Sequence, residues 1–131
     1  MKISVAMATY NGAQYIEEQL ESIRIQTMPV DEVRICDDGS SDDTVEVICH
    51  YIREHGLESS WSVEVNQENL GYASNFMKAV GLTNGDYVFF CDQDDIWIAD
   101  RAERMIGLME AHPDMLLLGS EFDSFVSAKD A

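Results

Sequence analysis

The chain has 131 residues, 46% of them hydrophobic, with 25 Asp or Glu against 8 Lys or Arg and a formal net charge of −17 at pH 7. This length and composition are typical of one globular domain, or part of one, and exclude a disordered chain. The negative charge argues against nucleic acid as the main partner and against direct contact with an anionic membrane surface. No stretch approaches the roughly 20 apolar residues of a membrane span.

The cysteines bear on the compartment of the protein. Cys36, Cys49 and Cys91 are odd in number and show no C-x-x-C spacing, so we expect buried, reduced thiols. Reduced thiols favour the cytoplasm, and the N-terminus lacks the layout of a signal peptide. We therefore expect a cytoplasmic protein, with peripheral attachment to the inner face of the membrane through further parts left open.

Five apolar runs predict strands, at residues 3–8, 33–36, 61–65, 87–91 and 115–118. Helical spacing between these runs predicts four helices. The first runs from Ala13 to Gln26, the second from an N-cap near Ser41 to Gly56, and the fourth from Ile98 to about His112. The third helix is expected to turn four apolar residues inward, namely Ala73, Phe76, Met77 and Val80.

Strands and helices thus alternate along the chain with short connections. This order predicts an α/β fold, with a mostly parallel sheet and helices on both of its faces. The sequence stops soon after the fifth run, so we expect a single domain over residues 1–131 that forms the first part of a larger protein.

An acidic stretch follows the fourth apolar run, where Asp92, Asp94 and Asp95 come within four residues. Because side chains alternate in an extended segment, Asp92 and Asp94 would point the same way and repel each other. A divalent cation such as Mg²⁺ or Mn²⁺ removes that repulsion, since both prefer carboxylate and phosphate oxygens. The alternative is a solvated acidic turn at the end of a strand.

Three polar loops follow predicted strands, at residues 9–12, 37–40 and 92–95. Successive β-α units place these loops on the same edge of the sheet, where α/β proteins bind ligands. The Gly-rich fingerprints of dinucleotide and P-loop sites are absent, and no Lys or Arg adjoins the strand ends in sequence. A metal ion is then the natural partner for a phosphate at this edge.

Several ordered motifs resemble the family 2 glycosyltransferases, and together they cover nearly the whole chain. They are residues 4–12, Ser22-Ile23-x-x-Gln26-Thr27, residues 37–44, Asn69-Leu70-Gly71 and residues 92–97. The Asp-Gln-Asp-Asp-Ile-Trp form of the last motif looks most like rhamnosyltransferase-type members that build bacterial surface polysaccharides.

The resemblance implies a GT-A fold and an inverting, metal-dependent sugar transfer. The donor would be a UDP- or dTDP-sugar, the acceptor a saccharide or lipid-linked saccharide, and the metal Mn²⁺ or Mg²⁺. An Arg that the family often carries before the fourth strand is missing from residues 69–75. The general base is expected beyond residue 131.

The resemblance also assigns roles to individual residues. Ala8, Thr9 and Tyr10 would line the base pocket, and Asn11 would also bind the donor. Asp38 would accept a hydrogen bond from the base, with Asp37 beside it as a further donor-binding residue. Asp92 would lie near the ribose or metal, Asp94 would be the main metal ligand, and the adjacent Asp95 would bind the donor.

Two other classes of function are consistent with parts of the pattern. One is a non-catalytic nucleotide-sugar-binding or interaction domain with the same fold. The other is a phosphotransfer domain, which also uses carboxylates and Mg²⁺ at strand ends but needs a Lys near a later strand. The first Lys after the fifth apolar run is Lys129, which disfavours that class.

Overall fold

The structure, a computed structural model, describes residues 1–91, 96–112, 115–119 and 124–127. Its elements alternate as the apolar runs predict. The strands are β1 (Ile3–Thr9), β2 (Glu32–Asp37), β3 (Trp61–Val65), β4 (Tyr87–Cys91), β5 (Met115–Gly119) and β6 (Ser124–Ser127), and the helices are α1 (Ile16–Arg24), α2 (Thr44–Glu54), α3 (Tyr72–Gly81) and α4 (Arg101–Ala111). In the described part of the chain, no helix combines the length and apolar character needed to cross a bilayer.

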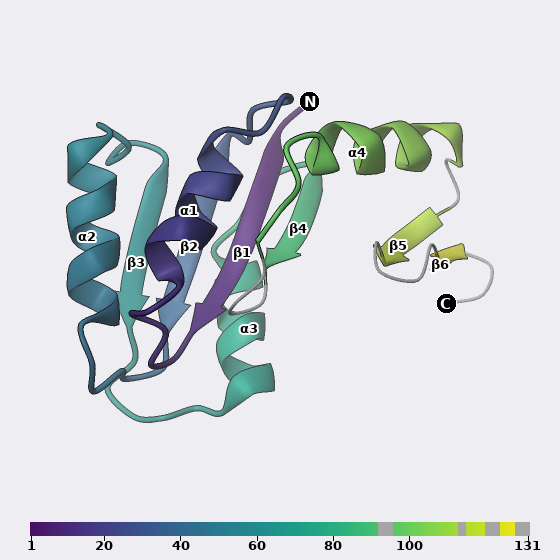
Figure 1. Cartoon of the computed structure of the whole chain (residues 1–131). Coiled ribbons are helices and arrows are strands. Elements are labelled where there is room, and N and C mark those ends of the chain that lie inside the picture. Colours follow the sequence, from purple (N-terminus) through teal and green to yellow (C-terminus); the bar gives the residue numbers. More distant parts are fainter. Residues whose placement is uncertain (92–95, 113–114, 120–123, 128–131) are drawn as a thin grey trace.

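A parallel sheet of four strands, in the order β3-β2-β1-β4, forms the centre of the fold. Val5 of β1 lies between Val33 and Phe89, and Met7 lies between Ile35 and Cys91. All four strands point toward the lower edge in Figure 1, where α3 begins. The predicted parallel sheet is confirmed, and β3, which contains Trp61, lies at one edge of it.

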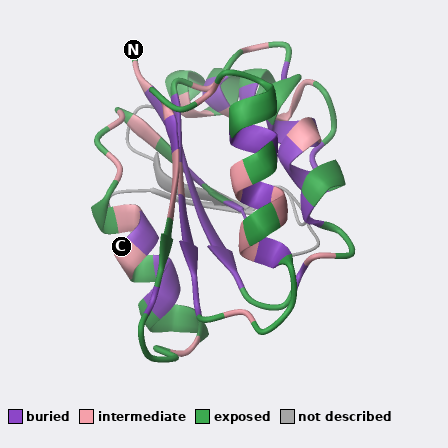
Figure 2. Ribbon diagram, turned by 90° about the vertical axis from the view of Figure 1, so that its left-hand side faces the viewer, coloured by how far each residue is buried: buried purple, intermediate pink, exposed green. Residues whose placement is uncertain are grey.

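Helices cover both faces of this sheet, as expected. On one face, α1, α2 and α4 bury apolar side chains such as Leu20, Ile48 and Ile106 in one cluster with residues of all four strands. On the other face, α3 packs Phe76 and Ala79 against a smaller cluster on the same strands. Figure 2 shows the buried strands lying between these layers. Strands covered on both faces explain why β1 is apolar almost throughout.

The fifth apolar run does not extend the parallel sheet, contrary to the prediction. β5 pairs antiparallel with β6, with Leu117 opposite Val126 and Gly119 opposite Ser124, as a separate two-stranded sheet. A strand that follows closely in sequence can pair antiparallel without the crossover that a parallel neighbour needs. Local pairing therefore replaces the expected fifth position in the sheet.

The helices differ in detail from their predicted form: α2 has its N-cap at Asp43 rather than Ser41, and α4 begins at Arg101 rather than Ile98. α1 covers Ile16–Arg24 rather than residues 13–26, and the side chain of Gln26 instead bonds to the Ser22 carbonyl, at 2.9 Å. On α3, Ala73 is exposed and Met77 is 66% exposed, and the polar Asn75 is buried instead. Buried polar groups require hydrogen-bond partners, and Asn75 has them.

The three cysteines are free thiols, as predicted. Cys36 and Cys91 are buried in the sheet, whereas Cys49 on α2 is only partly covered. Burial raises the pKa of the Cys36 thiol, which keeps it protonated. The cytoplasmic location inferred from reduced thiols stays a prediction.

Glu32, at the start of β2, is a buried carboxylate with a full set of donors. It accepts hydrogen bonds from the Ser4 hydroxyl at 2.5 Å and the Asn84 amide at 2.8 Å. Arg34 lies 3.0 Å and Lys2 3.7 Å from the same carboxylate. Burial alone would raise the pKa of Glu32, but these donors and charges outweigh it and lower the pKa below its ordinary value.

The depressed pKa of Glu32 predicts a loss of stability in acid. Its charged form stabilises the fold above the unfolded-state pKa, near 4.5, and this contribution disappears as the pH falls through the lower folded-state pKa. We expect Glu32→Gln to be less stable than wild type at pH 6 but to lose less on acidification to pH ~3, measured by urea unfolding. The matched control is Glu58→Gln, at an exposed position. Equal acid sensitivity of Glu32→Gln and wild type would contradict the prediction.

Candidate functional site

The loops that follow β1, β2 and β3 meet at the carboxyl edge of the sheet. They run over residues 10–15, 38–43 and 66–71 and lead into α1, α2 and α3. Figure 1 shows them together at the lower edge. Because each strand is parallel to its neighbour, the three loops leave the sheet side by side.

Asp37, the last residue of β2, joins two of these loops. Its side chain is fully buried, and one oxygen accepts from the Thr9 hydroxyl at 2.7 Å and the Ser40 hydroxyl at 2.6 Å. The other oxygen accepts from the backbone amides of Ser40 at 2.7 Å and Gly39 at 3.1 Å. Gly39 has a φ of +83°, which glycine adopts without strain. Asp37 thus fixes the turn that follows β2.

Asp38, the next residue, holds the third loop. Its carboxylate accepts from the backbone amides of Leu70 at 2.7 Å and Gly71 at 3.0 Å, and from the Asn66 side-chain amide at 2.9 Å. Burial would raise the pKa of this carboxyl, but the three donors outweigh burial and lower the pKa. Asp38 is therefore an anion at neutral pH, placed where two loops meet.

A chain of side-chain amides connects Asp38 to α3. Asn66 donates to the Asn75 side-chain oxygen at 2.7 Å, and Asn75 donates to the Cys36 carbonyl at 2.8 Å. The Lys78 ammonium donates to the Asn66 oxygen at 2.7 Å, so a cation lies two hydrogen bonds from Asp38. Sequence reasoning missed Lys78 because it adjoins no strand end. Its spacing of three residues from Asn75 on a helix was the available signal.

The first loop is locked to the second by backbone amides. The amide of Asn11 donates to the Ser40 hydroxyl, and the amide of Ser41 donates to the Asn11 side-chain oxygen, both at 2.8 Å. Gly12 donates to the Thr44 hydroxyl at 2.8 Å. Asn11 has a φ of +50°, a conformation that asparagine tolerates better than most residues. These bonds fix the first loop before any ligand is present.

The structure brings together part of the predicted site. Thr9, Asn11, Asp37 and Asp38 lie in one hydrogen-bonded cluster. Ala8 is buried at 5% exposure in the apolar cluster under α3, whereas Tyr10 at the rim is 47% exposed. Whether these residues bind a nucleotide stays a prediction.

The predicted metal ligands Asp92 and Asp94, and their neighbour Asp95, lie outside the described residues. Among the residues that the structure does describe, no group of three His, Cys, Asp or Glu side chains is arranged to hold a metal ion. The strand before the acidic stretch is described: Cys91 pairs in register with Met7, two residues before Thr9 on β1. Cys91, the last described residue before the acidic stretch, thus lies on the strand next to β1.

A parallel sheet with interlocked polar loops at its carboxyl edge defines an α/β protein of the kind whose members commonly bind ligands at that edge. The chain belongs to glycosyl transferase family 2, whose family model matches residues 4–127. This finding confirms the resemblance carried by the motifs at residues 4–12 and 37–44.

Among relatives, the chain is 40% identical over 104 residues to the dTDP-rhamnosyl transferase RfbG of Shigella flexneri, covering 76% of this chain and 35% of that protein. Its fold matches S. aureus TarS 1–349 in complex with UDP-GlcNAc at a TM-score of 0.77 and 30% identity, covering 90% of this chain and 34% of that one. It also matches the mannosyltransferase PcManGT of Pyrobaculum calidifontis in complex with GDP-Man and Mn²⁺, at a TM-score of 0.69 and 30% identity, covering 75% and 29%. The chain therefore spans about a third of the length of these relatives.

Proposed function

We propose that this chain is the nucleotide-sugar-binding part of a glycosyltransferase that acts in bacterial surface-polysaccharide synthesis. The donor is a UDP- or dTDP-sugar, and the acceptor is a saccharide or lipid-linked saccharide. The supporting observation is the cluster around Asp37 and Asp38, which interlocks three loops at the carboxyl edge of a fold shared with a UDP-GlcNAc-bound protein. The name of RfbG, a dTDP-rhamnosyl transferase, supports the choice of donor.

In this proposal, the base of the donor lies against the rim formed by Thr9, Tyr10 and Asn11. Asp38 is an anion whose carboxylate already orients two backbone amides, and an oxygen of the same group accepts the base N–H. A carboxylate oxygen has two lone pairs, so the group can serve the loop and the base together. This hydrogen bond to Asp38 would select a base that carries an N–H donor.

The diphosphate of the donor would be held at the end of β4 through Mn²⁺ or Mg²⁺, with Asp94 and Asp92 as ligands. Carboxylates at this edge suit such hard cations, and PcManGT was solved with Mn²⁺. A bound metal stabilises the negative charge that develops on the leaving diphosphate. The transfer would invert the anomeric centre, with the acceptor hydroxyl losing its proton to a general base beyond residue 131.

The proposal is tested by calorimetric titration of the protein with UDP and with dTDP, each with and without Mn²⁺. We expect one of the two nucleotides to bind, and its binding to tighten with Mn²⁺. Asp38→Asn should abolish binding with or without metal, because an amide group would meet the Leu70 and Gly71 amides and withdraw the acceptor. Asp94→Ala should remove only the metal-dependent gain in affinity.

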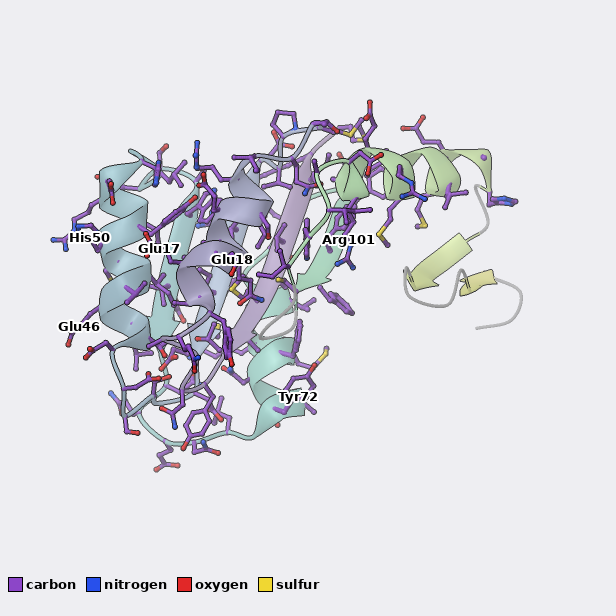
Figure 3. The ribbon with its side chains drawn as sticks, viewed as in Figure 1. Glu17, Glu18, Glu46, His50, Tyr72 and Arg101 are labelled. Carbon is purple, nitrogen blue, oxygen red and sulfur yellow. The ribbon has the colours of Figure 1, made fainter. Side chains whose placement is uncertain are left out.

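The control variant is Glu46→Gln, on the exposed face of α2 (Figure 3), which should bind like wild type. A folded wild-type protein that binds neither nucleotide with Mn²⁺ would overturn the proposal. Unchanged binding in Asp94→Ala would overturn the assignment of the metal ligand alone.

A further inference from the structure

The carboxylate of Asp38 keeps one acceptor position after its bonds to the described part of the chain are counted. Its Oδ1 accepts from the Leu70 backbone amide and from the Asn66 side-chain amide, which together use both lone pairs of that oxygen. Its Oδ2 accepts from the Gly71 amide, which leaves the second lone pair of Oδ2. Because Asp38 is only 5% exposed, the orientation of its carboxylate decides whether that lone pair is presented to a ligand.

The side chain of Asn66 keeps the carboxylate in this orientation. Two acceptors face its amino group, the Asp38 carboxylate at 2.9 Å and the Asn75 side-chain oxygen at 2.7 Å. The Asn75 oxygen faces Asn66 because the Asn75 amino group donates to the Cys36 carbonyl. A side-chain amide has two N–H donors, so Asn66 satisfies both acceptors only when its nitrogen points toward them.

Lys78, on α3, fixes the other end of the Asn66 side chain. Its ammonium group donates to Asn66 Oδ1 at 2.7 Å. An ammonium group has three donors and no acceptor, so it pairs with the oxygen of an amide and not with the nitrogen. The bond from Lys78 therefore holds the Asn66 nitrogen toward Asp38.

A surface ion pair is the simpler account of Lys78. Its ammonium group also lies 3.6 Å from the Glu64 carboxylate, and the two side chains are 37% and 49% exposed. Ion pairs between exposed side chains contribute little to stability. The bond to Asn66 differs from this pair because Asn66 is buried and its amide nitrogen donates to two acceptors inside the protein.

We propose that Lys78, acting through Asn66, is a positioning residue that turns the Asp38 carboxylate toward the N–H of the base. This inference rests on the proposed function, in which Asp38 accepts that N–H. Without Lys78, the Asn66 oxygen loses its partner, and the amide can turn or move away from Asp38. The carboxylate then gains freedom to rotate, and its Oδ2 meets the base N–H less often. Lys78 thus governs the selection of the base and needs no contact with the ligand.

The test compares two nucleosides that differ at one group. Uridine carries the N–H that Asp38 would accept, and 3-methyluridine carries a methyl group on that nitrogen. Both lack phosphate, so their binding is measured by NMR titration without metal. We expect wild type to bind uridine roughly 10-fold more tightly, as for a hydrogen bond to a charged group. If dTDP is the nucleotide bound, thymidine and 3-methylthymidine replace this pair.

Lys78→Met keeps the aliphatic part of the side chain and removes its charge and its donors. We expect the preference for uridine over 3-methyluridine to fall roughly threefold or more, which is the effect of one net hydrogen bond. The affinity for 3-methyluridine should change less than the affinity for uridine, because the methylated base never donates to Asp38.

Two variants are matched controls. Glu64→Gln removes the ion pair of Lys78 and leaves its bond to Asn66, so it should keep the wild-type preference. Arg53→Met removes the same charge at an exposed position on α2 and should also keep that preference.

An unchanged preference in Lys78→Met would overturn the inference, and so would an equal loss of affinity for both nucleosides, which a purely structural role predicts. A loss of preference in Glu64→Gln as large as that in Lys78→Met would assign the effect to the ion pair instead. In these cases wild type still binds and distinguishes the nucleosides, so the proposed function stands.

A wild type that binds the nucleosides without preference would overturn the base contact of Asp38 together with the inference. A wild type that binds no nucleoside, and neither UDP nor dTDP with Mn²⁺, would overturn the proposed function as well.

Discussion

Replacing Asp37 with alanine is expected to lower the free energy of unfolding by about 3 kcal/mol. The buried carboxylate accepts four hydrogen bonds, two of them from the backbone amides of Gly39 and Ser40. Hydrogen bonds to a charged group contribute more than neutral ones, and donors left buried without an acceptor add a desolvation cost. Urea unfolding of the variant and of wild type measures the difference.

Asp43→Ala is the matched control for this prediction. Asp43 is the exposed N-cap residue of α2, its side chain makes no capping bond, and its loss removes the same charge. We expect its stability to stay within about 0.5 kcal/mol of wild type. If Asp37→Ala and Asp43→Ala lose similar amounts, the role given to Asp37 in joining the loops is wrong.

Gly85→Ala is expected to destabilise the protein by about 2 kcal/mol, for a different reason. Gly85 precedes β4, and a Cβ atom there would overlap the Ser4 side-chain oxygen and lie 2.9 Å from the Lys2 carbonyl oxygen. Because one obstacle is backbone, β1 or the turn before β4 must shift. The Ser4 hydroxyl also donates to Glu32, so the shift disturbs that buried carboxylate as well.

The control is Gly107→Ala, in the middle of α4, where an added Cβ meets no atom within 4 Å. Alanine loses less backbone entropy than glycine in a helix, so this variant should gain up to about 1 kcal/mol. The midpoint of thermal or urea unfolding should therefore fall in Gly85→Ala and rise in Gly107→Ala. A neutral Gly85→Ala would mean that the turn before β4 adjusts freely.

Much of the fold could be predicted because apolar runs and their spacing encode it directly. The mostly apolar sequence of β1 is typical of a strand covered on both faces, and the alternation of elements indicated parallel pairing. The position of β5 could not be derived in this way. An apolar run does not say which strand it will pair with, and here a neighbour in sequence, β6, competes successfully with the sheet.

Sequence reasoning assigned residues to the candidate site only where they lie close in sequence to a strand end. Asp37 and Asp38 qualify, and the structure places both in the loop cluster. Asn75 and Gln26 do not qualify, because their partners, Cys36 and Ala102, are distant along the chain. In the sequence, a polar residue that is buried against a partner far along the chain looks the same as a polar residue exposed to solvent. Met77 was predicted to face inward because it is apolar, but apolar character alone does not determine which face of a helix is buried.

The exposed acidic side chains are a separate feature from the loop cluster. Glu17 on α1 and Glu46 on α2 are labelled in Figure 3 away from Tyr72, which marks the start of α3. With 25 acidic residues, charge on the helices is consistent with a solvated surface. The hydrogen-bonded acids Asp37 and Asp38 differ because they are buried.

The bonds from Thr9 to Asp37 and from Asn66, Leu70 and Gly71 to Asp38 join positions 28 to 33 residues apart. They form only when β1, β2 and the start of α3 have come together. The conformational entropy of these loops is therefore lost when the protein folds and not when a ligand binds. A ligand that arrives at the carboxyl edge meets loops that are already ordered, and its binding free energy is not reduced by ordering them. Substitutions that loosen the loops would weaken affinity without removing a single ligand contact.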